Sequence, residues 1–309
     1  MAGGLNILVR WALYLDLMLL LGLPAFLLYA PAATRAPLNR AIALRPLLVL
    51  LAFTGIALSV LGLAVTAAAM ADVPLTSLDR PTVTMILTQT PLGTAWQVRL
   101  AALVLAALGA LLLPAGRALA AAATLPGAIA LGTLAWGGHG AAGEGTAGTV
   151  QLWADICHLI GAGIWIGALA AFGLLLFRPH RSDSTGHIEA SARSLDRFAS
   201  VGALSVALLI ATGLVNGFML VGWSGLPRLP ATLYGQLLIA KLVIFAGMLG
   251  LAATNRFRLT PALTVAVATG DTVRATAALR RSLAVETAAA LTILAVVALL
   301  GTLAPPASS

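Results

Sequence analysis

Residues 159–177 read LIGAGIWIGALAAFGLLLF, an uninterrupted apolar stretch that contains no charged residue. A helix of about 20 such residues is long enough to cross the hydrocarbon core of a bilayer. The chain contains eight apolar runs of this kind, centred near Leu20, Leu58, Leu105, Ile129, Ile164, Leu209, Phe245 and Leu294. The sequence therefore predicts an all-α, polytopic membrane protein with eight transmembrane helices in a single domain, residues 1–309.

The basic residues gather in alternate gaps between these runs. Thirteen arginines follow the first, third, fifth and seventh runs: Arg35, Arg40, Arg45, Arg117, Arg178, Arg181, Arg193, Arg197, Arg256, Arg258, Arg274, Arg280 and Arg281. Elsewhere the chain has only Arg10, Arg80, Arg99, Arg228 and Lys241. Because cytoplasmic loops of membrane proteins carry an excess of Lys and Arg, the four arginine-rich loops are predicted to be cytoplasmic and both termini to lie outside. Arginines after the first run also oppose export of that loop, which favours a retained span over a cleaved signal peptide.

The composition excludes an ordinary soluble domain. Apolar residues make up 60% of the chain and charged residues 9%. The formal net charge of +8 is explained by the cytoplasmic loops, where arginines meet anionic lipid, so we expect contact with membrane lipid and none with nucleic acid. The single cysteine, Cys157, excludes an internal disulfide and a CxxC redox pair.

Four loops are long enough to contain more than a turn. The predicted cytoplasmic loops are 178–194 and 257–278. On the outer side, residues 71–94 carry prolines and polar residues and are expected to hold a short interfacial helix. Residues 137–145 read GGHGAAGEG, and so many glycines permit unusual backbone angles and close approach to a ligand.

A weak internal repeat suggests two parallel four-helix halves, residues 1–140 and 141–309. Gly93 is followed six residues later by Arg99, and Gly235 by Lys241 at the same interval. Likewise, Trp11 is followed five residues later by Asp16, and Trp153 by His158 at the same interval. Four spans return the chain to its starting side, so the halves would have the same orientation, as in some transporters.

Ionisable residues inside the predicted spans are the first functional candidates, because such groups are costly in a bilayer. They are Asp16, Arg99, Asp155, His158, Lys241 and Glu286. Helix rise places all but Glu286 near the outer surface, where we expect one polar cluster, with Lys241 paired to Asp16 or Asp155. An alternative for Arg99 and Lys241 is snorkelling to the interface. Glu286 is expected to form a structural ion pair with Arg280 or Arg281.

The fifth span carries the densest chemistry. Asp155 and His158 are three residues apart and share one helix face, so the carboxylate could orient the imidazole as it does for metal-bound histidines. His139, in the glycine-rich loop, can fold back over the top of this span and supply a second nitrogen. Imidazole and thiolate ligands suit copper better than magnesium or calcium. The sequence therefore predicts that the metal ligands are His139, His158, Cys157 and Asp155. Cys157, however, lies about 100° around the helix from His158.

The chain resembles the copper-resistance protein D (CopD/PcoD) family of bacterial inner-membrane proteins. The most specific stretch is residues 158–169, HLIGAGIWIGAL, in which Ala168 stands where the family pattern has a second glycine. Shorter matches span most of the chain, at Thr90–Gly93 with Trp96 and Arg99, Gly138–Gly140, Asp196–Phe198, Ala211–Gly213, Tyr234–Leu238 with Lys241, and Asn255–Arg256. The resemblance implies an eight-helix protein of the bacterial inner membrane that takes part in copper homeostasis or resistance. It also implies transport of copper ions from periplasm to cytoplasm, alongside a small periplasmic copper-binding partner of the CopC type.

Two other classes of function stay open on the sequence. A membrane redox protein with a single haem would need His139 and His158 as axial ligands. An assembly or structural factor would use the polar groups only to fix helix packing. In none of these three interpretations do we expect the chain to be an enzyme.

Overall fold

The fold was analysed in a computed structural model that describes residues 2–30, 43–138, 145–177, 184–269 and 272–304. Within these ranges the chain is helical and contains no strand. Eight helices are long and apolar enough to cross a membrane, at 3–29, 44–70, 91–112, 117–137, 145–177, 200–223, 233–267 and 272–300. The predicted all-α, eight-span architecture is confirmed, and the orientation in the membrane stays a prediction.

The spans are formed by the following elements: α1 (Ala2–Tyr29), α3 (Leu44–Met70), α5 (Pro91–Leu112), α6 (Arg117–Gly132) with η2 (Thr133–Gly137), α7 (Gly145–Phe177), α8 (Ser184–Gly225), α9 (Leu233–Thr254) and α11 (Thr272–Leu300). Three shorter pieces, η1 (Leu75–Ser77), α4 (Arg80–Gln89) and η4 (Leu226–Ala231), lie between spans. After α9 the helix continues through the π-helical turn η5 (Asn255–Leu259) into α10 (Thr260–Thr269). The two predicted cytoplasmic loops are thus partly helical, because α8 begins early and α10 extends the seventh span.

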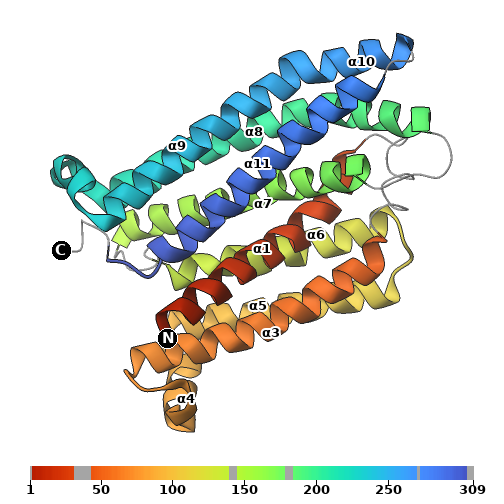
Figure 1. The fold of residues 1–309 in the computed structure, drawn as a ribbon. Helices are drawn as coiled ribbons and strands as arrows, with labels where there is room; N and C mark the ends of the chain where they lie inside the picture. The colour runs from red at the N-terminus through yellow and green to blue at the C-terminus, as the bar shows by residue number, and fades with distance from the viewer. Residues whose placement is uncertain (1, 31–42, 139–144, 178–183, 270–271, 305–309) are drawn as a thin grey trace.

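The helices form two groups that meet at α1 and α7. In the first group α1, α3, α5 and α6 each pack on two neighbours and close a four-helix bundle. In the second, α7 packs on α8 and α11, and α9 packs on α11. Figure 1 shows α1 and α7 in the middle of the molecule, with α3, α4 and α5 on one side and α8, α9 and α10 on the other.

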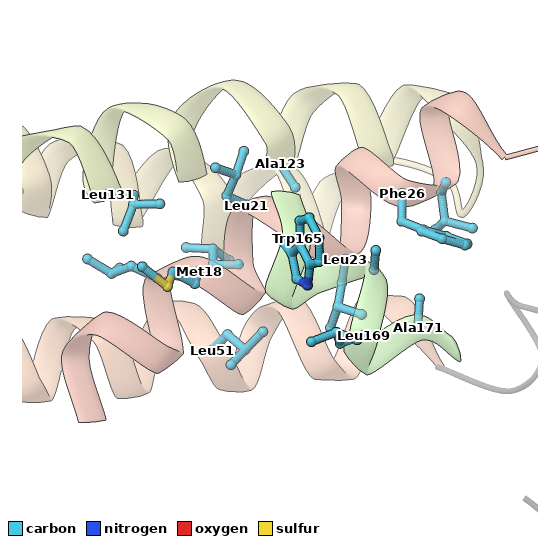
Figure 2. Packing of buried hydrophobic residues seen from close by; sticks show 14 of the residues in the cluster. Met18, Leu21, Leu23, Phe26, Leu51, Ala123, Leu131, Trp165, Leu169 and Ala171 are labelled. Carbon is cyan, nitrogen blue, oxygen red and sulfur yellow. The ribbon is translucent and has the colours of Figure 1, made fainter. Parts of the chain in front are cut away.

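Glycines allow the two central helices to touch. A Cβ added at Gly22 of α1 would collide with the backbone of α7 at Gly163 and Gly167, and one at Gly167 would collide with Gly22. Small residues of this kind let membrane helices approach closely. Around the crossing lies an apolar core that includes Met18, Leu21 and Trp165, shown in Figure 2.

Arginines tie helix ends together at both ends of the bundle. Arg45, at the start of α3, donates to the Leu113 carbonyl after α5 (2.7 Å), and Arg280 of α11 donates to the Leu176 carbonyl of α7 (2.7 Å). At the opposite end Arg10 donates to the Gly137 carbonyl (3.2 Å). Helix α1 starts and α11 ends at this second end, which is the predicted outer side (Figure 1).

The short outer helix predicted within residues 71–94 is present as α4. Asp79 caps it by accepting a hydrogen bond from the Thr82 amide (3.1 Å), and Pro81 occupies the first turn, where its missing N–H is not needed. The hydrogen bonds from Thr82 lower the pKa of Asp79.

Candidate functional site

The two predicted repeat motifs begin their spans in the same way. Thr90 caps α5 by accepting from the Gly93 amide (3.0 Å), and Thr232 caps α9 by accepting from the Gly235 amide (3.1 Å). Each glycine lies against the backbone of the short helix before it, α4 or η4, where a Cβ would collide. Glycine is therefore required at both positions, and in each span the cation lies on the third turn. Division of the chain into repeat halves stays a prediction.

A polar site forms where α7 and α8 pack together near the predicted outer end, and it is called the outer polar site below. His158 Nδ1 lies 2.9 Å from Thr212 Oγ1, and Asp155 Oδ1 accepts a hydrogen bond from Asn216 Nδ2 (2.9 Å). Asp155 and His158 are three residues apart on α7, and Thr212 and Asn216 are four apart on α8. Each pair therefore shares one helix face, and the two faces meet.

The Thr212 hydroxyl fixes which nitrogen of His158 carries the proton. A threonine hydroxyl has one hydrogen, and this one is donated to the Leu208 carbonyl (2.6 Å). Thr212 Oγ1 can then only accept, so Nδ1 is assigned as the donor and the lone pair of a neutral ring lies on Nε2. The sequence had suggested that Asp155 orients the ring. In the structure the ring is held by Thr212 instead. Nε2 thus keeps the lone pair that a metal ligand requires.

Lys241 of α9 supplies the positive charge of this site. Its field acts on both Asp155 and His158, and the charge of Asp155 acts in turn on Tyr234, also on α9. Of the two partners that the sequence offered for Lys241, Asp155 is the one with which its charge interacts. The positive charge of Lys241 thus offsets the negative charge of Asp155.

The site retains acceptor atoms that no described donor satisfies. Asn216 Oδ1 is buried without a hydrogen-bond partner. Gly138, the last described residue before the glycine-rich loop, lies beside Asp155 Oδ2, since a Cβ at Gly138 would be 3.9 Å from that oxygen. His139 follows directly but lies outside the described residues, so the loop begins at the carboxylate and its histidine is not placed.

The described residues do not bring a complete set of metal ligands together. Cys157 is a partly buried free thiol. Within the described ranges, no three His, Cys, Asp or Glu side chains come together in a way that could hold a metal ion. The nitrogen of His158, the carboxylate of Asp155 and the amide oxygen of Asn216 are the donors that the outer polar site offers. Thr212 and Asn216 were missed as site residues, although polar side chains one turn apart in an apolar span were a signal.

The single outer cluster expected from the sequence is divided between the two helix groups. Arg99 Nε donates to Thr133 Oγ1 (2.8 Å) within the first bundle. The charge of Arg99 also interacts electrostatically with Tyr14. Asp16 faces Gly55 of α3, with 5% of its surface exposed and Oδ2 unpartnered. Arg99 is buried rather than snorkelling, and neither residue belongs to the outer polar site.

Glu286 has different partners from those predicted. Its Oε1 accepts from Trp165 Nε1 (3.2 Å) and its Oε2 from Asn255 Nδ2 (3.0 Å), so both donors are neutral. Arg280 instead donates to the backbone of α7. The expected ion pair is therefore absent from the described contacts, because Arg280 and Arg281 are six and five residues before Glu286 and do not share its helix face.

Comparisons with known proteins cover nearly the whole chain. A family model described as "Copper resistance protein D-like, N-terminal domain" matches residues 1–149, and one described as "Copper resistance protein D" matches residues 192–300. Copper resistance protein D of Pseudomonas syringae pv. tomato is 42% identical over 306 residues, which are 99% of this chain and 98% of that protein.

Two further relatives match a part of the chain. Copper transport protein CutJ of Bacillus subtilis (strain 168) is 35% identical over 122 residues, 39% of this chain and 21% of that protein. Inner membrane protein YebZ of Escherichia coli (strain K12) is 29% identical over 128 residues, 41% of this chain and 42% of that protein. No solved structure matches. With eight apolar spans and a relative that aligns from end to end, this multi-pass inner-membrane protein belongs to the copper resistance protein D family.

Proposed function

We propose that this chain carries copper ions across the bacterial inner membrane, from the periplasm to the cytoplasm, and that the outer polar site is where the ion is first bound. Relatives named for copper resistance and copper transport support the choice of metal. The observation that carries the site is the hydrogen bond of His158 to Thr212, which leaves Nε2 as the ligand atom.

The proposed ligand set combines His158 Nε2 with Asp155, one turn earlier on α7. The third ligand is His139, from the glycine-rich loop that begins beside Asp155. Imidazole is a good copper ligand, and a ring held through its other nitrogen is the usual arrangement of a metal-binding histidine. Bound copper would replace the charge of Lys241 as the partner of Asp155. Release of the copper ion is thereby linked to the return of Lys241 as the charge partner of Asp155.

We also propose that a small periplasmic copper-binding protein of the CopC type delivers the ion. The support is the place of the glycine-rich loop at the predicted outer end, where Gly138 approaches Asp155. Deletion of such a partner in cells would then lower the copper supply to this chain and leave the affinity of the purified protein unchanged.

Copper accumulation in cells that express single variants tests the function. We expect His158→Ala and His139→Ala each to lower cellular copper about tenfold or more, at unchanged membrane abundance, since each removes a ligand. His180→Ala, in the predicted cytoplasmic loop, is the matched control and should accumulate copper like the wild type. Wild-type accumulation in both His158→Ala and His139→Ala would refute the site, and equal accumulation with and without the protein would refute the function.

A further inference from the structure

A second polar cluster lies deeper in the bundle, toward the end where arginines gather. It is centred on Glu286 of α11, which has 3% of its surface exposed, and on Asn255 in η5, with 7% exposed. Ser282 is one turn before Glu286 on the same face of α11 and is 8% exposed. These three residues are called the inner polar site.

The inner polar site has more oxygen acceptors than donors. Trp165 and Asn255 each donate one hydrogen bond to the carboxylate. Asn255 Oδ1, on the same amide group, is buried without a partner, and so is Ser282 Oγ. Burial of a carboxylate is very unfavourable unless a charge or proton compensates it, and neither of its two hydrogen bonds comes from a cation. Among the described residues, therefore, no cation is hydrogen-bonded to this carboxylate.

We propose that Glu286, Asn255 and Ser282 form a binding site for a small hard cation, H⁺ or Na⁺. Carboxylate, amide and hydroxyl oxygens are the donors that hard cations prefer, whereas copper prefers nitrogen and sulfur. Asn255 opens the π-helical turn η5, and such turns inside helices are frequent at functional sites. The two polar sites thus differ in ligand chemistry and bind different ions.

The same helices contribute to both sites. On α7, Trp165 follows His158 by seven residues, roughly 10 Å along the axis. Asn255 directly follows α9, which carries Lys241 near its outer end. Because α7 and α9 reach both sites, cation binding at the inner site and copper binding at the outer site act on the same two helices. This coupling rests on the proposed copper transport, but the existence of the inner site does not.

Equilibrium binding of ²²Na⁺ to the purified full-length protein without copper tests the Na⁺ form. We expect saturable binding that Glu286→Gln abolishes and that Ser282→Ala weakens about tenfold, because one oxygen ligand is lost. Asp16→Asn is the matched control, since it also neutralises a buried carboxyl group in a span, and it should bind like the wild type. Binding that persists in Glu286→Gln would overturn the Na⁺ site.

Infrared difference spectra between two pH values test the H⁺ form. A protonated-carboxyl band that disappears in Glu286→Gln and persists in Asp16→Asn assigns the site to H⁺. The other titratable or charged groups on the described elements that pack against α11, or on α11 itself, are Arg10, Tyr14, Asp16, Tyr29, Asp155, Cys157, His158, Tyr234, Lys241, Arg256, Arg258, Arg274, Arg280 and Arg281. The comparison of variants separates Glu286 from these groups.

Absence of both ²²Na⁺ binding and a Glu286-dependent band would overturn the proposal. If Glu286→Gln does not fold, Ser282→Ala decides the question, since an unchanged Na⁺ affinity and an unchanged pH midpoint of the band would also overturn it. Both measurements are made without copper. Failure of the inner site is therefore distinguished from failure of copper transport, which is read from His158→Ala in cells.

Discussion

The two helix groups place charged side chains in opposite surroundings. In the first bundle two thirds of the most apolar part of α1 is buried (67%), and Arg99 and Asp16 lie inside closed packing. In the second group the corresponding part is 61% buried in α7 but only 6% buried in α9, and Asp155, His158 and Lys241 on these two helices are only partly buried. The charged groups of the first bundle are closed off by packing, whereas the partly exposed groups of the second can be reached by an ion. The functional chemistry is therefore expected in the second group.

Glycine at the contact between the groups is expected to produce the largest effect. Gly167→Ala would place a methyl group into the backbone of Gly22, so we expect a loss of about 3 kcal/mol of stability or failure to fold. Gly173→Ala, on the same helix, meets no atom within 4 Å and should be tolerated. Size-exclusion chromatography and thermal unfolding of the two variants check this. Equal stability would show that the groups do not depend on this contact.

The threonines of the two groups should separate copper binding from stability. Thr212→Val removes the acceptor of His158 Nδ1, and we expect copper affinity to fall about 10- to 100-fold, as for other residues that orient a ligand. Thr212→Ser keeps a hydroxyl acceptor for His158 Nδ1, so it should restore the copper affinity. Thr133→Val removes the acceptor of Arg99 in the first bundle and should lower the melting temperature without changing affinity. Copper titration beside thermal unfolding distinguishes them, and an equal loss of affinity in both valine variants would contradict the division.

The cations Lys241 and Arg99 offer a sharper form of the same comparison. Lys241→Met removes a positive charge next to Asp155 and His158, so we expect copper to bind about tenfold more tightly. Arg99→Met, in the first bundle, should leave copper affinity unchanged. Isothermal titration at constant ionic strength measures both affinities. Weaker copper binding by Lys241→Met would show that the lysine belongs to the ligand set instead of opposing it.

The smallest expected effect concerns the helix caps of α4 and α9. Asp79 has a lowered pKa in the folded protein, so its cap stabilises α4 above the ordinary carboxyl pKa and is lost as the pH falls through the lowered value. Hydrogen exchange at the first turn of α4 should accelerate at that pH. The first turn of α9, capped by Thr232, has no carboxyl group in its cap and should show no such change beyond intrinsic chemistry. Asp79→Asn should remove the pH dependence.

The spans were predictable because each depends only on a local run of apolar residues, and the same holds for α4 with its Asp79–Pro81 start. His158 was also found, since an imidazole in such a run is conspicuous. Its partners Thr212 and Asn216 were not found, because the choice of partner depends on how α8 rotates against α7. The pairing of Glu286 was wrong for a related reason: closeness in sequence to Arg280 was taken for closeness in space.

The glycine contact between α1 and α7 also limits how the protein can move. A carrier must expose its cargo to one side of the membrane at a time, and many do so by rocking one half against the other. Here the halves touch backbone to backbone at Gly22 and Gly167, so rocking would separate surfaces that fit closely. In the proposed copper transport, alternating access would then fall to α8 and α9, which would move around a stationary pair of central helices and carry Thr212, Asn216 and Lys241 with them.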